Sequence, residues 1–434
     1  MKQLAEEAFF SKFTESLHDS ASRLVPPEIR SSWARSLYLS KWKKLLDSAE
    51  PDAAIVACDG SIGESSFSGR LVAWVARAIA HVYTKDGEVR SIPEVAVSID
   101  YGLEGRSLFM KALELETLTK AIDSAAAEFK RVFAVFDGSL YLTFFHYPPR
   151  IESMLAVFER YVRALANCLN AAKRNRTAIL GLSKDSDISY LRARILLDAL
   201  LQANPSVGEE LGTKQRSVRR MADRLREITE QHPKDTVLRS HLEEFSLETS
   251  DEALYSEVAS EPGFTRPLML APQTHFVTEE IDAGTTSWWK SIFRSRLKDR
   301  SPKFASLVVA LDEYYSQPPI AVSYWKARPE LGVHRVDIPS NPLGYDGRCG
   351  DLQEDKFADD NESLSAERLI ATLNWLSREP YVVNPLTEVD AVVRLDRGVY
   401  KQAYEPVIIE ELTKRGFKLN PRRRSVRDYV LRGY

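Results

Sequence analysis

The sequence predicts an α/β protein built on a mixed β-sheet, and two similar strand-and-turn segments are the main evidence. Apolar runs containing β-branched residues lead into Asp-Gly-Ser at residues 53–61 and again at residues 132–139. A hairpin pattern and a helical pattern separate the two segments, so strands that are neighbours in space are distant in sequence. This order favours a mixed sheet with a helix on one face.

The composition is that of an ordinary globular protein, with 44% hydrophobic and 28% charged residues among 434. No apolar stretch is long enough to span a membrane, and acidic residues near the N-terminus argue against a signal peptide. We therefore expect a cytoplasmic protein without membrane association. Three cysteines without paired spacing indicate neither a disulfide framework nor a cysteine-based zinc site.

Changes in composition and periodicity along the chain predict four regions. They are an N-terminal helical segment (1–50), the first part of the sheet-containing core (51–204), a charged helical insertion (205–265), and a region that completes the core and adds C-terminal helices and a basic tail (266–434). The insertion is expected to pack outside the core or to bind a partner.

Asp59 and Asp137 are the strongest candidates for a functional site. Each follows an apolar run and precedes a glycine, which predicts a carboxylate at the C-terminal edge of a strand where a ligand can approach the backbone. Two such carboxylates on neighbouring strands could hold a divalent cation, because hard cations prefer oxygen ligands. Asp-Gly is also a common turn dipeptide, so a structural role is the alternative for each aspartate.

Glu114 and Glu116 could supply a third carboxylate, which would allow a two-cation site for phosphodiester hydrolysis. Both lie in the predicted helix between the two strands and flank its buried stripe, so the sequence does not choose between them. Lys184 follows another apolar strand and could neutralise charge on a phosphoryl group. The alternatives are solvated helix acids and a surface lysine in a turn.

Two groups of basic residues could contact DNA. Arg335 alternates with Asp337 on one face of a predicted strand, where the pair is either a salt bridge or an extension of the charged site. Arg422, Arg423 and Arg424 form a local basic concentration in a chain whose formal net charge is −3. The alternative for this tail is a solvated terminus.

In their order along the chain, these segments resemble those of NurA nucleases over residues 50–200 and 265–415. The motifs are the strand with Asp59-Gly-Ser, a helix acid, the strand with Asp137-Gly-Ser-Leu, a strand with Ser183-Lys184, Arg-Val-Asp-Ile-Pro at residues 335–339, and Pro385-Leu386 followed by Asp390. No one of these motifs is specific, and the resemblance rests on all six occurring in sequence.

The resemblance implies an RNase H-like core with nuclease activity on DNA that depends on Mn²⁺ or Mg²⁺. It implies 5′ to 3′ exonuclease and single-strand endonuclease activity, a homodimer, and work with the hexameric ATPase HerA in DNA-end resection and double-strand break repair. By the same resemblance, Asp59 and Asp137 are metal ligands, and Glu114 or Glu116 is the helix acid, with Glu114 taken as the third ligand.

One departure from the family pattern supports a second hypothesis. The family often has a histidine after its Pro-Leu motif, whereas this chain has Asp390, which can bind metal but does not donate a proton near neutral pH. His334, close to Asp337 in sequence, could substitute or could be structural. The alternative function is therefore a catalytically decayed subunit that docks on the ATPase, although both Asp-Gly-Ser aspartates are present. A phosphotransferase of the sugar-kinase type is disfavoured because only residues 344–350 offer a late glycine-rich segment.

Overall fold

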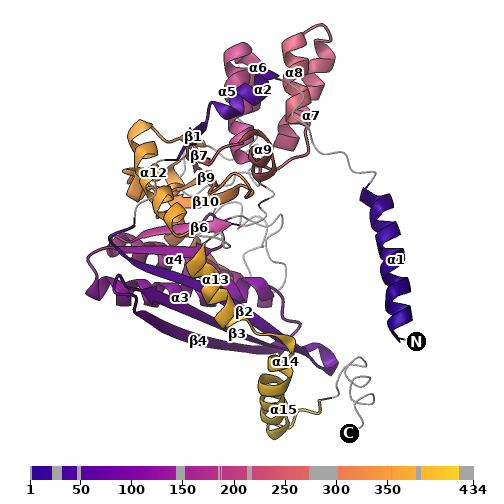
Figure 1. The fold of residues 1–434 in the computed structure, drawn as a ribbon, viewed down its shortest axis with the longest axis vertical. Coiled ribbons are helices and arrows are strands. Elements are labelled where there is room, and N and C mark those ends of the chain that lie inside the picture. Colours follow the sequence, from indigo (N-terminus) through magenta and orange to yellow (C-terminus); the bar gives the residue numbers. More distant parts are fainter. Residues whose placement is uncertain are drawn as a thin grey trace. The chain divides into compact units, whose positions relative to one another are not determined.

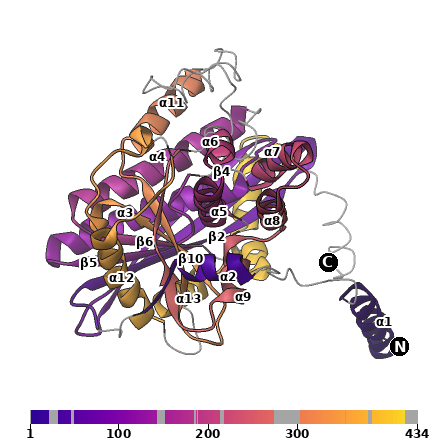
Figure 2. The ribbon, with the colours of Figure 1, turned by 90° about the horizontal axis from the view of Figure 1, so that it is seen from above.

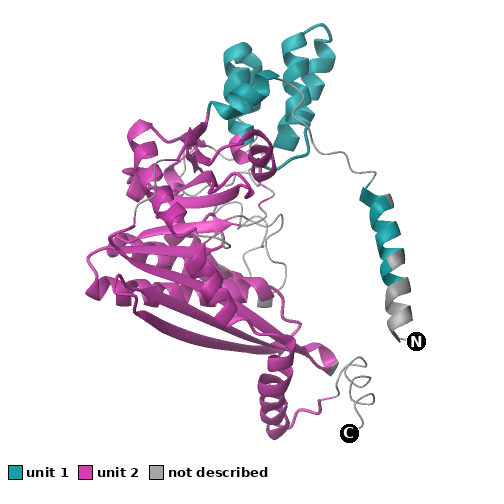
Figure 3. Ribbon diagram, in the orientation of Figure 1, with its two compact units in different colours: residues 1–40, 192–250 teal, residues 41–191, 251–434 magenta. Residues whose placement is uncertain are grey.

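The computed structural model describes most of the chain. The described residues are 2–21, 32–45, 50–142, 152–183, 186, 188–212, 218–272, 302–352, 354–377 and 383–419. They form two compact units (Figure 3): unit 1 comprises Met1–Ser40 and Arg192–Ser250, and unit 2 comprises Lys41–Leu191 and Asp251–Tyr434. Residues 205–250 of the predicted insertion thus fall in unit 1, whereas residues 251–265 belong to unit 2.

Unit 2 is built on one mixed sheet, in which the described strands are ordered β1-β7-β9-β10-β6-β5-β2-β3-β4 (Figure 1). β8 pairs with β9, and β11 pairs with β8. The strands are β1 (Trp42–Lys44), β2 (Ala54–Ser66), β3 (Leu71–Tyr83), β4 (Val89–Tyr101), β5 (Val132–Asp137), β6 (Ala178–Ser183), β7 (Gly263–Thr265), β8 (Leu268–Leu270), β9 (Ile320–Lys326), β10 (His334–Pro339) and β11 (Lys356–Phe357).

The centre of the sheet has the topology of an RNase H-like fold. β2, β3 and β4 form an antiparallel meander, and β5 and β6 follow on the other side of β2, each parallel to its neighbour. β3 is almost continuously buried because both of its faces are covered, whereas the edge strand β4 alternates between exposed and partly buried residues. The predicted fold class, a mixed sheet flanked by helices, is confirmed.

Helices cover both faces of this sheet. On one face, α3 (Arg106–Glu128) packs against β2 to β5 and alongside α4 (Glu152–Arg174), and α11 (Pro302–Tyr315) packs on α4 (Figure 2). On the other face, α12 (Asp360–Trp375) and α13 (Asn384–Val393) share a core with residues of β2, β5, β6 and β10. The sheet therefore positions its strand-end residues between two helical layers.

The remaining elements of unit 2 are short, and several of them lie near the C-terminus. A cluster of buried side chains from Phe67, β3, Leu395, Tyr400 and α15 packs together beyond the end of α13. These elements are η1 (Ser68–Arg70), α9 (Asp251–Val258), η2 (Asn341–Leu343), η3 (Cys349–Asp351), α14 (Arg397–Val399), the π-helical turn η4 (Tyr400–Tyr404) and α15 (Glu405–Lys414).

Unit 1 is helical. It contains α1 (Lys2–Ala21), α2 (Ser32–Leu39), α5 (Tyr190–Ala203) from Arg192 onward, α6 (Pro205–Gly212), α7 (Val218–Gln231) and α8 (Thr236–Phe245). Within it, the Tyr38 hydroxyl donates to Glu244 Oε2 at 3.3 Å, and the rings of Trp33 and His241 lie 4.8 Å apart, so α2 packs against α8. Among the helices of the described ranges, none has the length and apolar character to cross a membrane.

One part of the predicted N-terminal helical segment is wrong. Residues 42–44 form strand β1, which pairs antiparallel with β7. The Trp42 ring stacks on Tyr255 with 5.7 Å between ring centroids, and a Cβ at Gly263 would lie 2.5 Å from Trp42 Nε1. Pairing with a strand more than two hundred residues away therefore overrides the helical spacing of the local apolar residues.

Candidate active site

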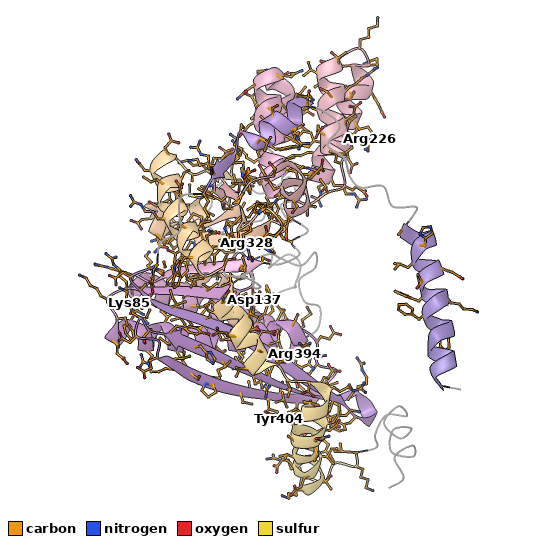
Figure 4. All side chains as sticks on the ribbon, viewed as in Figure 1. Lys85, Asp137, Arg226, Arg328, Arg394 and Tyr404 are labelled. Carbon is orange, nitrogen blue, oxygen red and sulfur yellow. The ribbon has the colours of Figure 1, made fainter. Side chains whose placement is uncertain are left out.

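Asp59 and Asp137 lie on adjacent parallel strands. Cys58 in β2 pairs with Phe136 in β5, so the two aspartates that follow are neighbours across the strands. β5 ends at Asp137, as predicted, and Figure 4 labels that side chain. The prediction that the other strand ends at Asp59 is wrong, because β2 continues to Ser66 through its pairing with β3. The pairing of β2 with β5 thus ends next to Asp59, whereas its pairing with β3 continues.

Glu114 of α3 approaches β2 at the glycine that follows Asp59. The Cys58 thiol donates to the Glu114 carbonyl oxygen at 3.3 Å, and a Cβ at Gly60 would lie 2.5 Å from Glu114 Oε1. Only a glycine at position 60 permits this approach, which gives the first Asp-Gly a role beyond turn formation. The Glu114 side chain is 2% exposed, so it is a buried carboxyl beside the two aspartates.

The environment of Glu114 disfavours its negative charge. Burial, together with the charges of Asp59 and Asp137, raises the pKa of Glu114 to about 8, and Lys111 and the nearby Gly60 N–H oppose this shift. Glu114 Oε1 is buried and has no hydrogen-bond partner among the described residues. An unpaired buried carboxyl oxygen is costly in a fold, and a cation bound beside it would remove that cost.

Glu116, the other helix acid, is engaged elsewhere. Arg160 of α4 donates to both of its carboxylate oxygens, at 2.8 Å from Nε and 2.7 Å from Nη2. About a third of each side chain is exposed. The structure therefore places Glu114 against β2 at the Asp59-Gly60 segment and leaves Glu116 in a helix-to-helix ion pair, a choice that the sequence left open.

The carboxylates of Asp59, Asp137 and Glu114 are suitable ligands for a divalent cation, but Asp59 and Glu114 lie on opposite faces of β2. Cys58 and Gly60 face α3, so Asp59 between them points to the opposite face, and Gly60 N–H donates to Asp59 Oδ1 at 2.7 Å. Among the described residues, no three acidic, histidine or cysteine side chains already converge as a metal-binding group. The carboxylate oxygens, among them the unpartnered Glu114 Oε1, are the kind of ligand that a divalent cation prefers. For all three carboxylates to bind one cation, their side chains would have to turn toward it.

Arg335 and Asp337 form a buried ion pair on β10, with 1% and 0% of their side chains exposed. Arg335 Nε donates to Asp337 Oδ1 at 2.7 Å. Although burial opposes the charge on the guanidinium, the Asp337 carboxylate keeps the pKa of Arg335 above its usual value. The salt bridge predicted as one alternative is confirmed, and the contact of Arg335 with DNA stays a prediction.

The other predicted site residues do not join the acidic group. His334 lies on the opposite face of β10 from Asp337, with its Nδ1 3.9 Å from Glu252 Oε1. Asp390 lies on the exposed face of α13, whereas Pro385 and Leu386 of the same helix are buried. Lys184, Arg422, Arg423 and Arg424 lie outside the described residues.

Two residues near the site were not predicted. Burial raises the pKa of the Tyr161 hydroxyl of α4, and the charges of Asp337 and Glu114 act in the same direction. At Gly181 in β6, a Cβ would lie 2.6 Å from the carbonyl oxygen of Gly138. The only sequence signals were a tyrosine on an apolar helical stripe and a glycine inside a strand.

The fold and the site together define an RNase H-like protein with aspartates on adjacent parallel strands and a buried helix acid close to one of them. The sequence profile of the NurA domain matches residues 53–344, more than half of the chain, and the protein belongs to this family. The crystal structure of the NurA nuclease from Sulfolobus solfataricus is 12% identical with a TM-score of 0.46, covering 95% of this chain and 98% of that one.

Two further solved structures were compared. Another NurA crystal structure is 14% identical with a TM-score of 0.33, covering 93% of this chain and 95% of that one. A type 1 RNase H with the type 2 active-site motif is 10% identical with a TM-score of 0.17, covering 32% of this chain and 68% of that one. No curated protein matches the sequence.

Proposed function

We propose that this protein is a divalent-metal-dependent deoxyribonuclease, acting as a 5′ to 3′ exonuclease and a single-strand endonuclease. The observation that carries the proposal is the buried, unpartnered Glu114 carboxyl oxygen beside two aspartates on adjacent parallel strands. Membership of the NurA domain family supports the same assignment.

In this proposal, Asp59, Asp137 and Glu114 hold Mn²⁺ or Mg²⁺. When bound, the ion supplies charge stabilisation to the phosphoryl group being cleaved. Glu114 must lose its proton before it can act as a ligand, since its pKa is raised to about 8. Lys184 would place a positive charge near the same phosphate.

The proposed partners are DNA, a second copy of the chain and a hexameric ATPase of the HerA type, in DNA-end resection during double-strand break repair. A surface on edge strand β4 supports self-association. Val95, Val97 and Tyr101 are each more than half exposed and lie on one face of this strand, which has a free edge in the described part of the sheet. Apolar rows of this kind on monomers are uncommon and often mark interfaces.

Cleavage of end-labelled single- and double-stranded DNA with Mn²⁺, Mg²⁺ or EDTA tests the proposal. We expect metal-dependent cleavage by the wild type and loss of cleavage by at least about a thousandfold in Asp59→Ala and Asp137→Ala, since each change removes a ligand. The matched control is Glu116→Gln, which removes an acid of the same helix that does not face the site and is expected to retain cleavage.

Both aspartate variants should keep their fold, because removing a carboxylate from a mutually repelling group does not destabilise it. Wild-type-like cleavage by a folded Asp59→Ala variant would refute the metal-site assignment. Absence of cleavage by the wild type with every metal, alone and with the ATPase, would instead favour the alternative function, a catalytically decayed subunit that docks on the ATPase. The exposed Asp390, which stands in place of a histidine, supports this alternative.

A further inference from the structure

The residues that follow Asp137 are held by a single carboxylate from another part of the chain. Asp337 Oδ2 accepts from the Ser139 hydroxyl at 2.7 Å, from Leu140 N–H at 2.9 Å and from Tyr141 N–H at 3.1 Å. Asp337 is 0% exposed and lies nearly two hundred residues further along the chain. One buried oxygen thus organises three consecutive residues of the loop.

Arg335 completes this arrangement from the same strand. Its Nε donates to Asp337 Oδ1 at 2.7 Å, and its Nη2 lies 3.1 Å from Asp337 Oδ2 and 3.3 Å from the Ser139 hydroxyl oxygen. Both oxygens of Asp337 are therefore occupied by donors within the protein. A carboxylate in this state has little capacity left for a metal ion, in contrast to Glu114 with its unpartnered oxygen.

The held loop begins directly after the proposed metal ligand. Only Gly138 separates Asp137 from Ser139, and the Gly138 carbonyl oxygen lies where a side chain at Gly181 would stand. The loop thus packs over β6 at Gly181 and is bonded to Asp337, the residue of β10 that pairs with Gly181. The orientation of a carboxylate at the end of a strand depends on how firmly the backbone that follows it is held.

We propose that Asp337, itself fixed by Arg335, is a positioning residue that orients Asp137 by holding the Ser139–Tyr141 loop and is not a metal ligand. This inference rests on the proposed function for its catalytic consequence. Loss of the carboxylate is expected to loosen the loop and to weaken metal binding through Asp137. Outer-sphere contacts of this kind typically change metal affinity by about 10- to 100-fold.

The test compares the wild type, Asp337→Asn and the double variant Arg335→Gln/Asp337→Asn in the full chain. Asp337→Asn leaves the Arg335 charge buried without its partner and directs an amide toward it. The double variant is electrically neutral, and the asparagine amide can donate to the glutamine while its oxygen accepts from the loop. It therefore serves as the folded comparison if the single variant proves too unstable.

Two readouts are measured. Mn²⁺ binding by calorimetry is expected to weaken by at least about tenfold in Asp337→Asn and to return to within about threefold of the wild type in the double variant. Hydrogen exchange is expected to accelerate in the peptide that contains Leu140 and Tyr141 in the single variant and to recover in the double variant, with the β2 peptide unchanged.

The outcomes separate the two proposals. A folded double variant that fails to recover Mn²⁺ affinity would make Asp337 a ligand and overturn the positioning role, as would unchanged exchange of the loop in Asp337→Asn. A wild-type protein that neither binds Mn²⁺ nor cleaves DNA would refute the proposed function. Loop exchange would still decide in that case whether Asp337 holds the loop.

Discussion

Glu114→Gln tests whether the acidic centre is under electrostatic strain. An acid whose pKa rises from 4.5 in the unfolded chain to about 8 in the folded protein binds more protons when folded over this interval. The free energy of unfolding must therefore fall as pH rises from 4.5 to 8 and level off above 8. At about 1.4 kcal/mol per pH unit, the full loss is about 5 kcal/mol.

The glutamine variant cannot ionise and should not show this loss. Relative to the wild type in EDTA, the free energy of unfolding of Glu114→Gln should rise by about 3 kcal/mol between pH 6 and pH 9, the part of the effect that falls in this range. Urea unfolding followed by the fluorescence of buried Trp74 and Trp325, both in unit 2, measures the difference. Added Mn²⁺ should restore wild-type stability more at pH 9 than at pH 6, because metal and proton compete for the same carboxyl.

Glu116→Gln is the matched control on the same helix. Its loss of a partly exposed ion pair with Arg160 should change stability by at most about 1 kcal/mol, equally at pH 6 and pH 9. Parallel pH profiles for the wild type and Glu114→Gln would refute the reasoning, since they would mean that Glu114 pays no desolvation cost in the folded protein.

Two glycines on β2 give further predictions. Gly60→Ala should displace the Glu114 carboxyl, because the new Cβ would lie 2.5 Å from Glu114 Oε1. We expect Mn²⁺ affinity and cleavage to fall by at least about tenfold, with a small change in the urea midpoint. Equal Mn²⁺ affinity in the variant and the wild type would contradict this. Gly63→Ala should loosen the C-terminal helices, because its Cβ would lie 2.7 Å from Tyr400 Cγ and closer to two other ring atoms. We expect about 1–3 kcal/mol of destabilisation and faster hydrogen exchange in η4 and α15, whereas Gly332→Ala, which adds a Cβ in open space, should have neither effect.

The central sheet was predictable because its signals are local. Apolar runs, turn residues and one amphipathic helix are enough to predict β2, β5 and α3, and the two aspartates follow from the strands that carry them. The strand β1 was missed because its stability comes from pairing with β7 and from the Trp42–Tyr255 stack, which no local pattern encodes. The continuation of β2 to Ser66 was missed because Asp-Gly-Ser usually ends a strand, whereas here β3 pairs along it throughout.

The choice between Glu114 and Glu116 depends on two contacts that the sequence does not reveal. Arg160 on α4 neutralises Glu116, and Gly60 on β2 makes room for Glu114. Both partners are distant in sequence from the helix, and neither is distinguishable from an ordinary surface arginine or turn glycine. The same limitation applies to Asp337, whose pattern with Arg335 indicated a charged pair but not the loop that it holds.

The buried carboxyl groups of Asp337 and Glu114 differ in how far hydrogen bonds within the protein satisfy them. Asp337 is surrounded by donors from Arg335 and the Ser139–Tyr141 loop, so its negative charge is balanced within the fold and stabilises one conformation. Glu114 has two negative neighbours and a buried oxygen without a hydrogen-bond partner among the described residues. A fold that fully satisfies one buried acid could satisfy the other by the same means, for instance with the arginine that it gives to Glu116. Leaving Glu114 unsatisfied lowers stability at neutral and alkaline pH, and in the proposed function a cation bound beside it would offset this cost.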